Sequence, residues 1–257
     1  MGGIKRLFYD IETSPNIVFS WRTGNKLHIS HDNIIQERSI ICICYKWENQ
    51  NRVYSITWDN GDDKNLVKEF SDIVSSADEI IAHNGDKFDY KWLNGRNLIH
   101  GLPPIPKAKT VDTLKLARKH FYFNSNTLDY LSKVLLGEGK METTFGLWKD
   151  ICLLNDQTAL RKMVRYCKKD VELLQRIWEK LREYDAPATH AAVFETGNMS
   201  DRWMCPYCGS PDVSLSKTRP TPRGIVQRQM QCGECHRYYT IADSVFKNYL
   251  VAKEGAK

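Results

Sequence analysis

The stretch Phe8-Tyr9-Asp10-Ile11-Glu12-Thr13 places two acids near the end of an apolar segment. Because alternate side chains of a strand share a face, Asp10 and Glu12 point the same way, while Tyr9 and Ile11 point into packing. Two acids side by side repel each other unless a cation offsets their charge. Hard oxygen ligands on a rigid strand suit a divalent metal ion, and a solvated strand end is the simpler alternative.

Outward from this strand, the first 185 or so residues alternate strand-like and helix-like patterns. Apolar β-rich runs indicate strands, and apolar residues at a 3.6-residue period indicate helices. Three early strands followed by alternating helices and short strands predict an α/β domain with a mixed sheet. The predicted strands are 5–12, 39–47, 52–59, 79–83 and 110–112, and the predicted helices are 64–77, 88–97, 113–120, 127–136 and 156–184.

Two later segments contribute further acids. Asn84-Gly85-Asp86-Lys87-Phe88-Asp89 follows a predicted strand, and Tyr166-Cys167-Lys168-Lys169-Asp170 lies in the longest predicted helix, with Tyr166 and Asp170 one turn apart. Each acid has a structural alternative: Asp89 suits a helix N-terminus, and Asp170 suits a surface ion pair. Three nearby residues are interpreted as structural, namely Asp86 as a turn residue, Asp112 as a helix cap and His83 as a packed or hydrogen-bonded histidine.

Taken together, these three motifs resemble the 3′–5′ exonuclease family of the ribonuclease H-like fold that is named for its Asp-Glu-Asp-Asp carboxylates. Their order, spacing and elements agree with that family over roughly residues 4–184, and Val111–Arg118 also resembles it. The resemblance implies a mixed sheet flanked by helices. Tyr166, with Arg165 where the other class has His, indicates the Tyr class, which includes proofreading domains of family A and B DNA polymerases. No polymerase domain follows, so we expect a stand-alone trimming enzyme.

The same resemblance implies two-metal hydrolysis of a phosphodiester with two Mg²⁺ or Mn²⁺ ions. Asp10 would bridge the ions, Glu12 and Asp170 would hold the ion that activates water, and Asp89 would support the other, through water. Tyr166 would orient the attacking water, since a phenol titrates near about pH 10. Two further residues, Asn84 and Phe88, would position and stack the terminal nucleotide, although Phe88 fits a core aromatic equally well.

Four of the eight cysteines form two Cys-x-x-Cys pairs near the C-terminus. Two such pairs predict one structural Zn²⁺ held by four thiolates, and a disulfide or redox pair is the alternative. The segment Gln229–Thr240 resembles the second knuckle of a zinc ribbon, so His236 is not needed as a ligand. A small basic module of this kind folds largely because of its metal. The predicted zinc ligands are Cys205, Cys208, Cys232 and Cys235. The other four cysteines, in apolar segments, are interpreted as buried free thiols.

The C-terminal module is the basic part of the chain. Residues 201–257 contain nine Lys/Arg and five Asp/Glu, whereas the preceding 200 residues contain 28 and 26. Cations that contact phosphates and aromatic rings that stack on bases hold single strands without sequence preference. A protein-binding ribbon is the alternative. The substrate-binding candidates here are Arg219, Arg223, Arg228 and Tyr238.

The sequence predicts three parts: an exonuclease domain over 1–185, a linker over 186–200 and a zinc ribbon over 201–257. No run of about 18 apolar residues exists, and the N-terminus resembles neither a signal peptide nor a myristoylation signal. We therefore expect an intracellular, cytoplasmic protein with no membrane partner, and a phage origin would fit its size.

The resulting hypothesis is a metal-dependent 3′–5′ exonuclease that acts on nucleic acid, with single-stranded DNA favoured over RNA. An RNA 3′ exonuclease, an endonuclease, and a non-catalytic nucleic-acid-binding or interaction protein on a nuclease fold are the alternatives.

Overall fold

The computed structural model describes residues 3–24 and 26–254. It divides into two compact units, one of residues 5–184 and one that contains residues 185–257. Two sequence-based predictions fall partly outside the described residues. They are the absence of a targeting signal, which concerns the start of the chain, and the ribbon module, whose last three residues are not described. Within the described part of the chain, no helix has the length and apolar character needed to cross a membrane.

The larger unit is built on a five-stranded sheet with the strand order β5-β4-β1-β6-β7. Its central strand, β1, pairs antiparallel with β4 and parallel with β6, so the predicted mixed sheet is confirmed. In the β1–β4 register, Asp10 lies opposite Cys44 and Glu12 opposite Cys42. The strands are β1 (Arg6–Thr13), β4 (Ile40–Trp47), β5 (Tyr54–Thr57), β6 (Glu79–Ala82) and β7 (Lys109–Asp112).

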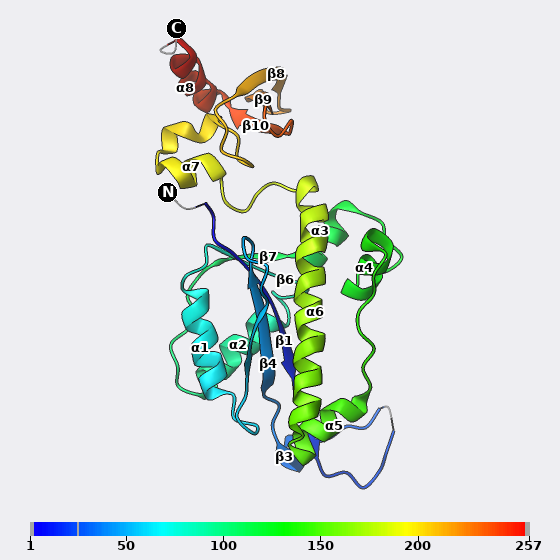
Figure 1. Ribbon diagram of the computed structural model, residues 1–257. Helices are drawn as coiled ribbons and strands as arrows, with labels where there is room; N and C mark the ends of the chain where they lie inside the picture. The colour runs from blue at the N-terminus through cyan, green and yellow to red at the C-terminus, as the bar shows by residue number, and fades with distance from the viewer. Residues whose placement is uncertain (1–2, 25, 255–257) are drawn as a thin grey trace. The chain divides into compact units, whose positions relative to one another are not determined.

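Helices cover both faces of this sheet (Figure 1). Because side chains alternate in direction along β1, successive residues of this strand face helices on opposite sides of the sheet. Tyr9 packs against Phe70 of α1 (Lys64–Val74), with ring centroids 5.3 Å apart. Phe8 packs edge-on against Trp178 of α6 (Gln157–Leu181) on the other face, at 5.2 Å. Because side chains two apart share a face, Asp10 and Glu12 point toward α6, the helix that contains Asp170.

Helix α6 forms because its apolar residues recur at the helical period and because Asp156 caps it. The Asp156 carboxylate accepts hydrogen bonds from the N–H groups of Thr158 and Ala159, which lack partners inside the helix. A 3₁₀ turn over Arg182–Tyr184 completes the predicted segment 156–184. The remaining helices of this unit are α2 (Asp89–Ile99), α3 (Thr113–His120), α4 (Leu128–Leu136) and α5 (Phe145–Leu154).

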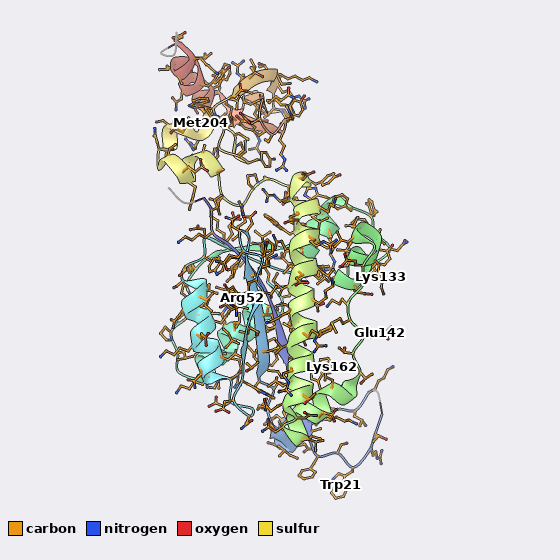
Figure 2. All side chains as sticks on the ribbon, viewed as in Figure 1. Trp21, Arg52, Lys133, Glu142, Lys162 and Met204 are labelled. Atoms are coloured by element: carbon orange, nitrogen blue, oxygen red, sulfur yellow. The ribbon has the colours of Figure 1, made fainter. Side chains whose placement is uncertain are left out.

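Two features of this unit were absent from the sequence-based prediction. One is the hairpin of β2 (Ile17–Val18) and β3 (Ile34–Gln36), with a 3₁₀ turn over His31–Asn33. Strands of two and three residues are too short to display an alternating pattern. Trp21, in the loop between them, is fully exposed and is labelled at the bottom of Figure 2. The other is α5, a short helix that no sequence pattern indicated.

The C-terminal unit has a three-stranded antiparallel sheet with the order β10-β9-β8. Its small core includes Trp203 and Tyr239, whose hydroxyl donates to the Trp203 carbonyl at 2.6 Å. Within the predicted linker 186–200, buried Ala191 and Ala192 start a helix, and the Ala191 N–H donates to the Pro206 carbonyl. The elements are α7 (Ala191–Thr196), a 3₁₀ helix (Met199–Trp203), β8 (Val213–Pro220), β9 (Val226–Cys232), β10 (Tyr238–Ala242) and α8 (Asp243–Glu254).

Candidate metal centre and catalytic site

Three of the predicted acids meet where β1 faces α6. Asp10, Glu12 and Asp170 each offer a carboxylate oxygen, and these oxygens all lie within 4.8 Å of one another. Asp170 is almost fully buried, and its Oδ1 has no hydrogen-bond partner among the described residues. A buried acceptor left without a donor is costly, and a divalent cation is the partner that an all-oxygen donor set of this size suits. The residues present therefore fit a metal ion.

Burial and mutual repulsion make this cluster unfavourable as three free anions. Burial is the largest cause that raises the pKa of Asp10 well above its ordinary range, and neighbouring Cys167 and Asp89 raise it further. Burial likewise raises the pKa of Glu12 to about 8 and also raises the pKa of Asp170. Carboxyl groups shifted in this direction gain from a bound cation that restores their charge.

The fourth predicted acid, Asp89, lies beside this cluster and not within it. Asp89 is the first residue of α2 and is buried. Its Oδ1 accepts the N–H of Ile11 at 3.2 Å, so it fixes the strand between the two β1 acids. Burial raises the pKa of Asp89 to about 7, although the hydrogen bonds from backbone N–H groups oppose the rise. Gly85 precedes it because a Cβ there would collide with Ala82.

Lys140, in the loop between α4 and α5, is a site residue that the sequence motifs do not include. Its Nζ donates to Asp170 Oδ2 at 2.6 Å and lies 3.5 Å from the Tyr166 hydroxyl. Burial lowers the pKa of Lys140, but the nearby charges of Asp170 and Asp10 outweigh this and raise it. No periodicity or spacing marks the segment Gly137–Lys140, so only the tertiary structure identifies this cation.

Tyr166 lies one helical turn before Asp170 and is half-buried. Its hydroxyl lies 3.5 Å from Lys140 Nζ, and Asp170 follows four residues later on the same face of α6. Burial raises the pKa of Tyr166 to about 12, and the charge of Asp170 adds to the rise. The phenol is therefore a hydrogen-bonding group at neutral pH.

The two predicted nucleotide-positioning residues lie in the turn before α2. Asn84 has a positive φ of 66° and its N–H donates to Asp112. Phe88 is half-buried with its ring 6.3 Å from that of Trp92, so it packs against the core and keeps one part accessible.

The three residues interpreted as structural behave as such. Asp112 caps α3 by accepting the N–H groups of Leu114 and Lys115. His83 hydrogen-bonds to Thr113 and to the Asn126 carbonyl. Asp86 lies in the turn and pairs with Lys115 at 2.6 Å.

Buried thiols lie directly behind the carboxylates. Cys42, Cys44 and Cys167 are fully buried and free, whereas Cys152 is only half-buried. The Cys167 thiol lies 3.5 Å from the Asp10 carbonyl and 3.6 Å from Asp10 Oδ2. The three buried thiols fill the space between β4 and α6 and pack against the carboxylate cluster from the protein interior.

The four C-terminal cysteines also converge. Cys205 and Cys235 have sulfurs 3.6 Å apart, and so do Cys208 and Cys232. Tetrahedral zinc with bonds of about 2.3 Å separates its sulfurs by about 3.8 Å, whereas a disulfide would place them about 2.05 Å apart. The cluster is thus compatible with a zinc ribbon. Gly233 lies in the second knuckle, where a Cβ would collide with Asp212.

The predicted nucleic-acid-binding residues of this unit differ in whether their side chains are exposed or already bound to other residues. Arg219 on β8 and Arg223 in the following turn are exposed, and Tyr238 is half exposed. Arg228 instead donates to Asp243 at 2.7 Å and lies 4.8 Å over the Phe246 ring. Its guanidinium therefore joins β9 to α8.

Residues 32–182 match the family model described as the RNase H superfamily. The chain belongs to the RNase H superfamily. The matched segment contains Asp89, Tyr166 and Asp170 and starts after Asp10 and Glu12. This membership agrees with the mixed sheet and its flanking helices.

Among solved structures, the RNase H superfamily chain is similar to the family B DNA polymerase from the hyperthermophilic archaeon Pyrobaculum calidifontis. The TM-score is 0.56 at 15% identity, and the match covers 86% of this chain and 31% of the polymerase. The chain thus spans about a third of that protein's length, and the likeness concerns the fold. No curated protein matches the sequence.

Proposed function

We propose that this protein is a metal-dependent 3′–5′ exonuclease that hydrolyses the terminal phosphodiester of a single strand, with DNA as the preferred substrate. The observation that carries the proposal is the convergence of Asp10, Glu12 and Asp170, with a buried Asp170 oxygen that lacks a partner. Membership of the RNase H superfamily supports nuclease chemistry in general.

The residues divide the work as follows. Asp10, Glu12 and Asp170 would hold the metal, and Asp89 would support a second ion through water while it fixes β1 through Ile11. When bound, Mg²⁺ or Mn²⁺ supplies a water of lowered pKa and neutralises charge on the phosphate. Tyr166 donates a hydrogen bond toward the attacking water, a role that its raised pKa favours over proton abstraction.

Lys140 adds a second source of positive charge at the same place. Its ammonium contacts Asp170 and lies 5.5 Å over the Tyr166 ring. A cation held at this position can attract the phosphate of an incoming strand, and it relieves repulsion among the carboxylates before a metal binds.

The direction of digestion and the choice of DNA are supported by the motif pattern and by the ribbon. Tyr166 four residues before Asp170 is the feature that the sequence shares with the Tyr class of 3′–5′ exonucleases. Exposed Arg219 and Arg223 in the C-terminal unit are suited to hold a single strand, and a structural zinc would fix that unit.

End-labelled substrates test this proposal. Single-stranded DNA, duplex DNA and RNA of one sequence, labelled at the 5′ or 3′ end, are digested with Mg²⁺ or Mn²⁺ beside an Asp10→Ala variant. We expect a 5′-label ladder that shortens stepwise on single-stranded DNA and immediate loss of the 3′ label as a mononucleotide. Activity that survives Asp10→Ala, shortening from the 5′ end alone, or internal cuts would contradict it.

A further inference from the structure

The outer edge of β10 is open in the C-terminal unit, because β10 is an end strand of the three-stranded sheet. The Cys232 N–H donates to the Arg237 carbonyl, and the pairing of β9 with β10 continues from there in one register through Ala242. Backbone groups of an antiparallel strand turn alternately toward and away from the partner strand. Those of Tyr238, Thr240 and Ala242 therefore face outward, where no other described strand pairs with them.

The opposite edge of the same sheet has features that prevent strand addition, whereas the β10 edge has none. β8 contains Pro220 and the cations Lys217 and Arg219, and its pairing with β9 shifts register. Proline, cations and bulges are the features by which edge strands avoid pairing with other chains. β10 reads Tyr-Tyr-Thr-Ile-Ala, which is uncharged and rich in β-forming residues. An open edge of this composition is suited to accept a further strand.

A groove of about 470 Å³ lies against this open edge. It is lined by 239–242 of β10 and by residues on both sides of α7, all of them within the C-terminal unit. A strand of three residues occupies about 10 Å in length, 4.8 Å in width and 10 Å in depth, or about 480 Å³. The groove therefore has room for one short strand. The lining residues outside β10 that matter here are Pro187, Arg202, Pro206 and Tyr207.

The side chains of the groove combine apolar surface with one cation. Pro187, Pro206 and Tyr207 are half-buried and offer apolar surface. Arg202 is exposed, and its Nε donates to the Met199 carbonyl at 3.2 Å. Because this acceptor is neutral and no described carboxylate lines the groove, the guanidinium charge is available to an acidic ligand.

We propose that the β10 edge binds an extended segment of another protein as an added strand, with apolar side chains at alternate positions and an acidic residue beside Arg202. The outward N–H and C=O groups of β10 would bond to the backbone of that segment, and the groove would select its alternate side chains. A second copy of β10 suits the groove less well, because its five residues include no acid for Arg202. Arg219 and Arg223, the nucleic-acid candidates, lie on β8 and in the turn after it, away from this edge.

A phage-displayed library of random peptides, selected on the full-length protein prepared with zinc, tests this inference. Thr240→Pro removes an N–H that points away from β9, so the pairing of β9 with β10 is kept. Thr240→Val is the matched control, because it keeps both the N–H and the branched shape. We expect the enriched peptides to alternate apolar side chains and to carry an acid. Thr240→Pro should weaken their binding by at least about tenfold, and Thr240→Val by less than about twofold.

Changes to the peptide give a second test that does not depend on how the Thr240→Pro protein folds. An enriched peptide is N-methylated at every second residue, in two versions that cover alternate positions. Only alternate N–H groups of an added strand face β10, so one version should lose at least about tenfold in affinity and the other less than about threefold. Arg202→Gln should weaken binding of the acidic peptide by about twofold to fivefold. It should leave unchanged the binding of the same peptide with glutamine in place of the acid.

Three results would overturn the inference. They are the absence of any peptide that prefers the unmodified protein to Thr240→Pro, an equal loss with both N-methylated versions, and a dimer of the unmodified protein that dissociates in Thr240→Pro. The last would assign the edge to a second copy of this chain. All of these measurements report binding or association, so their outcome is independent of whether the protein digests nucleic acid.

Discussion

The carboxylate cluster and the cysteine cluster of this protein differ in how they depend on the surrounding fold. The carboxylates lie on β1 and α6, elements that are held by a large core, and they converge because the fold brings residues 158 positions apart, from Glu12 to Asp170, together. The cysteines lie in two tight knuckles within a unit whose buried core is only a few residues, among them Trp203, Met230 and Phe246. The carboxylate cluster depends on its fold, whereas we expect the cysteine cluster, with zinc bound, to stabilise the fold around it.

This contrast predicts which property of each unit, activity or folding, should depend on its metal. A large core gives the sheet and α6 enough apolar burial to fold without a metal, so the carboxylates need the ion for chemistry. A small core cannot do this, so we expect zinc binding to supply folding free energy to the C-terminal unit. Removing a metal should therefore cost activity in one unit and structure in the other.

The largest effect is expected at Asp10. Asp10→Asn should lower kcat by roughly 10³-fold or more, because it removes a ligand from the metal centre, while the metal-free protein unfolds at an equal or higher temperature. The control is Asp63→Asn, since Asp63 is a fully buried acid that bonds to Arg96, His100 and the Ile40 N–H. Breaking that network should cost about 3–5 kcal/mol of stability. Thermal melts and single-turnover rates of both variants check the separation.

Next in size is the loss of a zinc ligand. Cys232→Ser should abolish stoichiometric zinc binding and leave residues 201–254 open to protease, because the module's own core is small. The larger unit should keep its unfolding temperature. Metal analysis and limited proteolysis are the measurements, and Cys152→Ser, a half-buried thiol of the larger unit, is the matched control. A Cys232→Ser protein that resists protease would show that the module folds without zinc.

The carboxylate cluster should also make the metal-free protein sensitive to pH. Burial raises the pKa of Glu12 to about 8 and that of Asp89 to about 7, so the folded state binds more protons than the unfolded state between about pH 4.5 and 8. Stability contributed by these protonated groups is present below the lower limit and is lost as pH rises through the folded values. We expect Tm in EDTA to fall by roughly 5 °C over this range, and Mg²⁺ to reverse most of the fall. Glu12→Gln should flatten the profile.

A smaller effect is expected from Lys140. Lys140→Ala leaves Asp170 without its cation, so Tm in EDTA should fall by about 2–4 °C, which corresponds to about 1 kcal/mol for a partly accessible pair. The gain in Tm on adding Mg²⁺ should be larger than in the unmodified protein, because the ammonium no longer competes for Asp170. Lys133→Ala is the control, since Lys133, which is labelled in Figure 2, makes an exposed pair with Asp129 on α4. Equal Mg²⁺ responses in both variants would contradict the role of Lys140.

The smallest effect concerns the exposed arginines of the C-terminal unit. The double variant Arg219→Ala and Arg223→Ala should bind single-stranded DNA with a salt slope reduced by about 1.4, at about 0.7 per lost phosphate contact. Arg228→Ala should instead destabilise the unit, because that guanidinium is held by Asp243. Binding isotherms at several salt concentrations test this, and an unchanged slope would assign the ribbon to a protein partner.

The sequence by itself determined the sheet strands, most helices of the larger unit and the candidate ligand residues. The period of two along 8–13 placed Asp10 and Glu12 on one face, and the 3.6-residue period of 157–181 produced the long helix. Local chemistry also determined the cap at Asp112 and the pairing of the cysteine knuckles, because such features depend on residues close in sequence.

Only the tertiary structure decided which residues complete each site. Lys140 reaches Asp170 from a loop with no pattern, and the Trp148 indole donates a hydrogen bond to the carbonyl of Thr13, which is 135 positions before it. Asp89 turned out to fix Ile11 beside the cluster, and Arg228 turned out to bind Asp243. Such contacts depend on how distant segments pack. A sequence pattern records which face a side chain occupies, but the packing of the elements determines what that face meets.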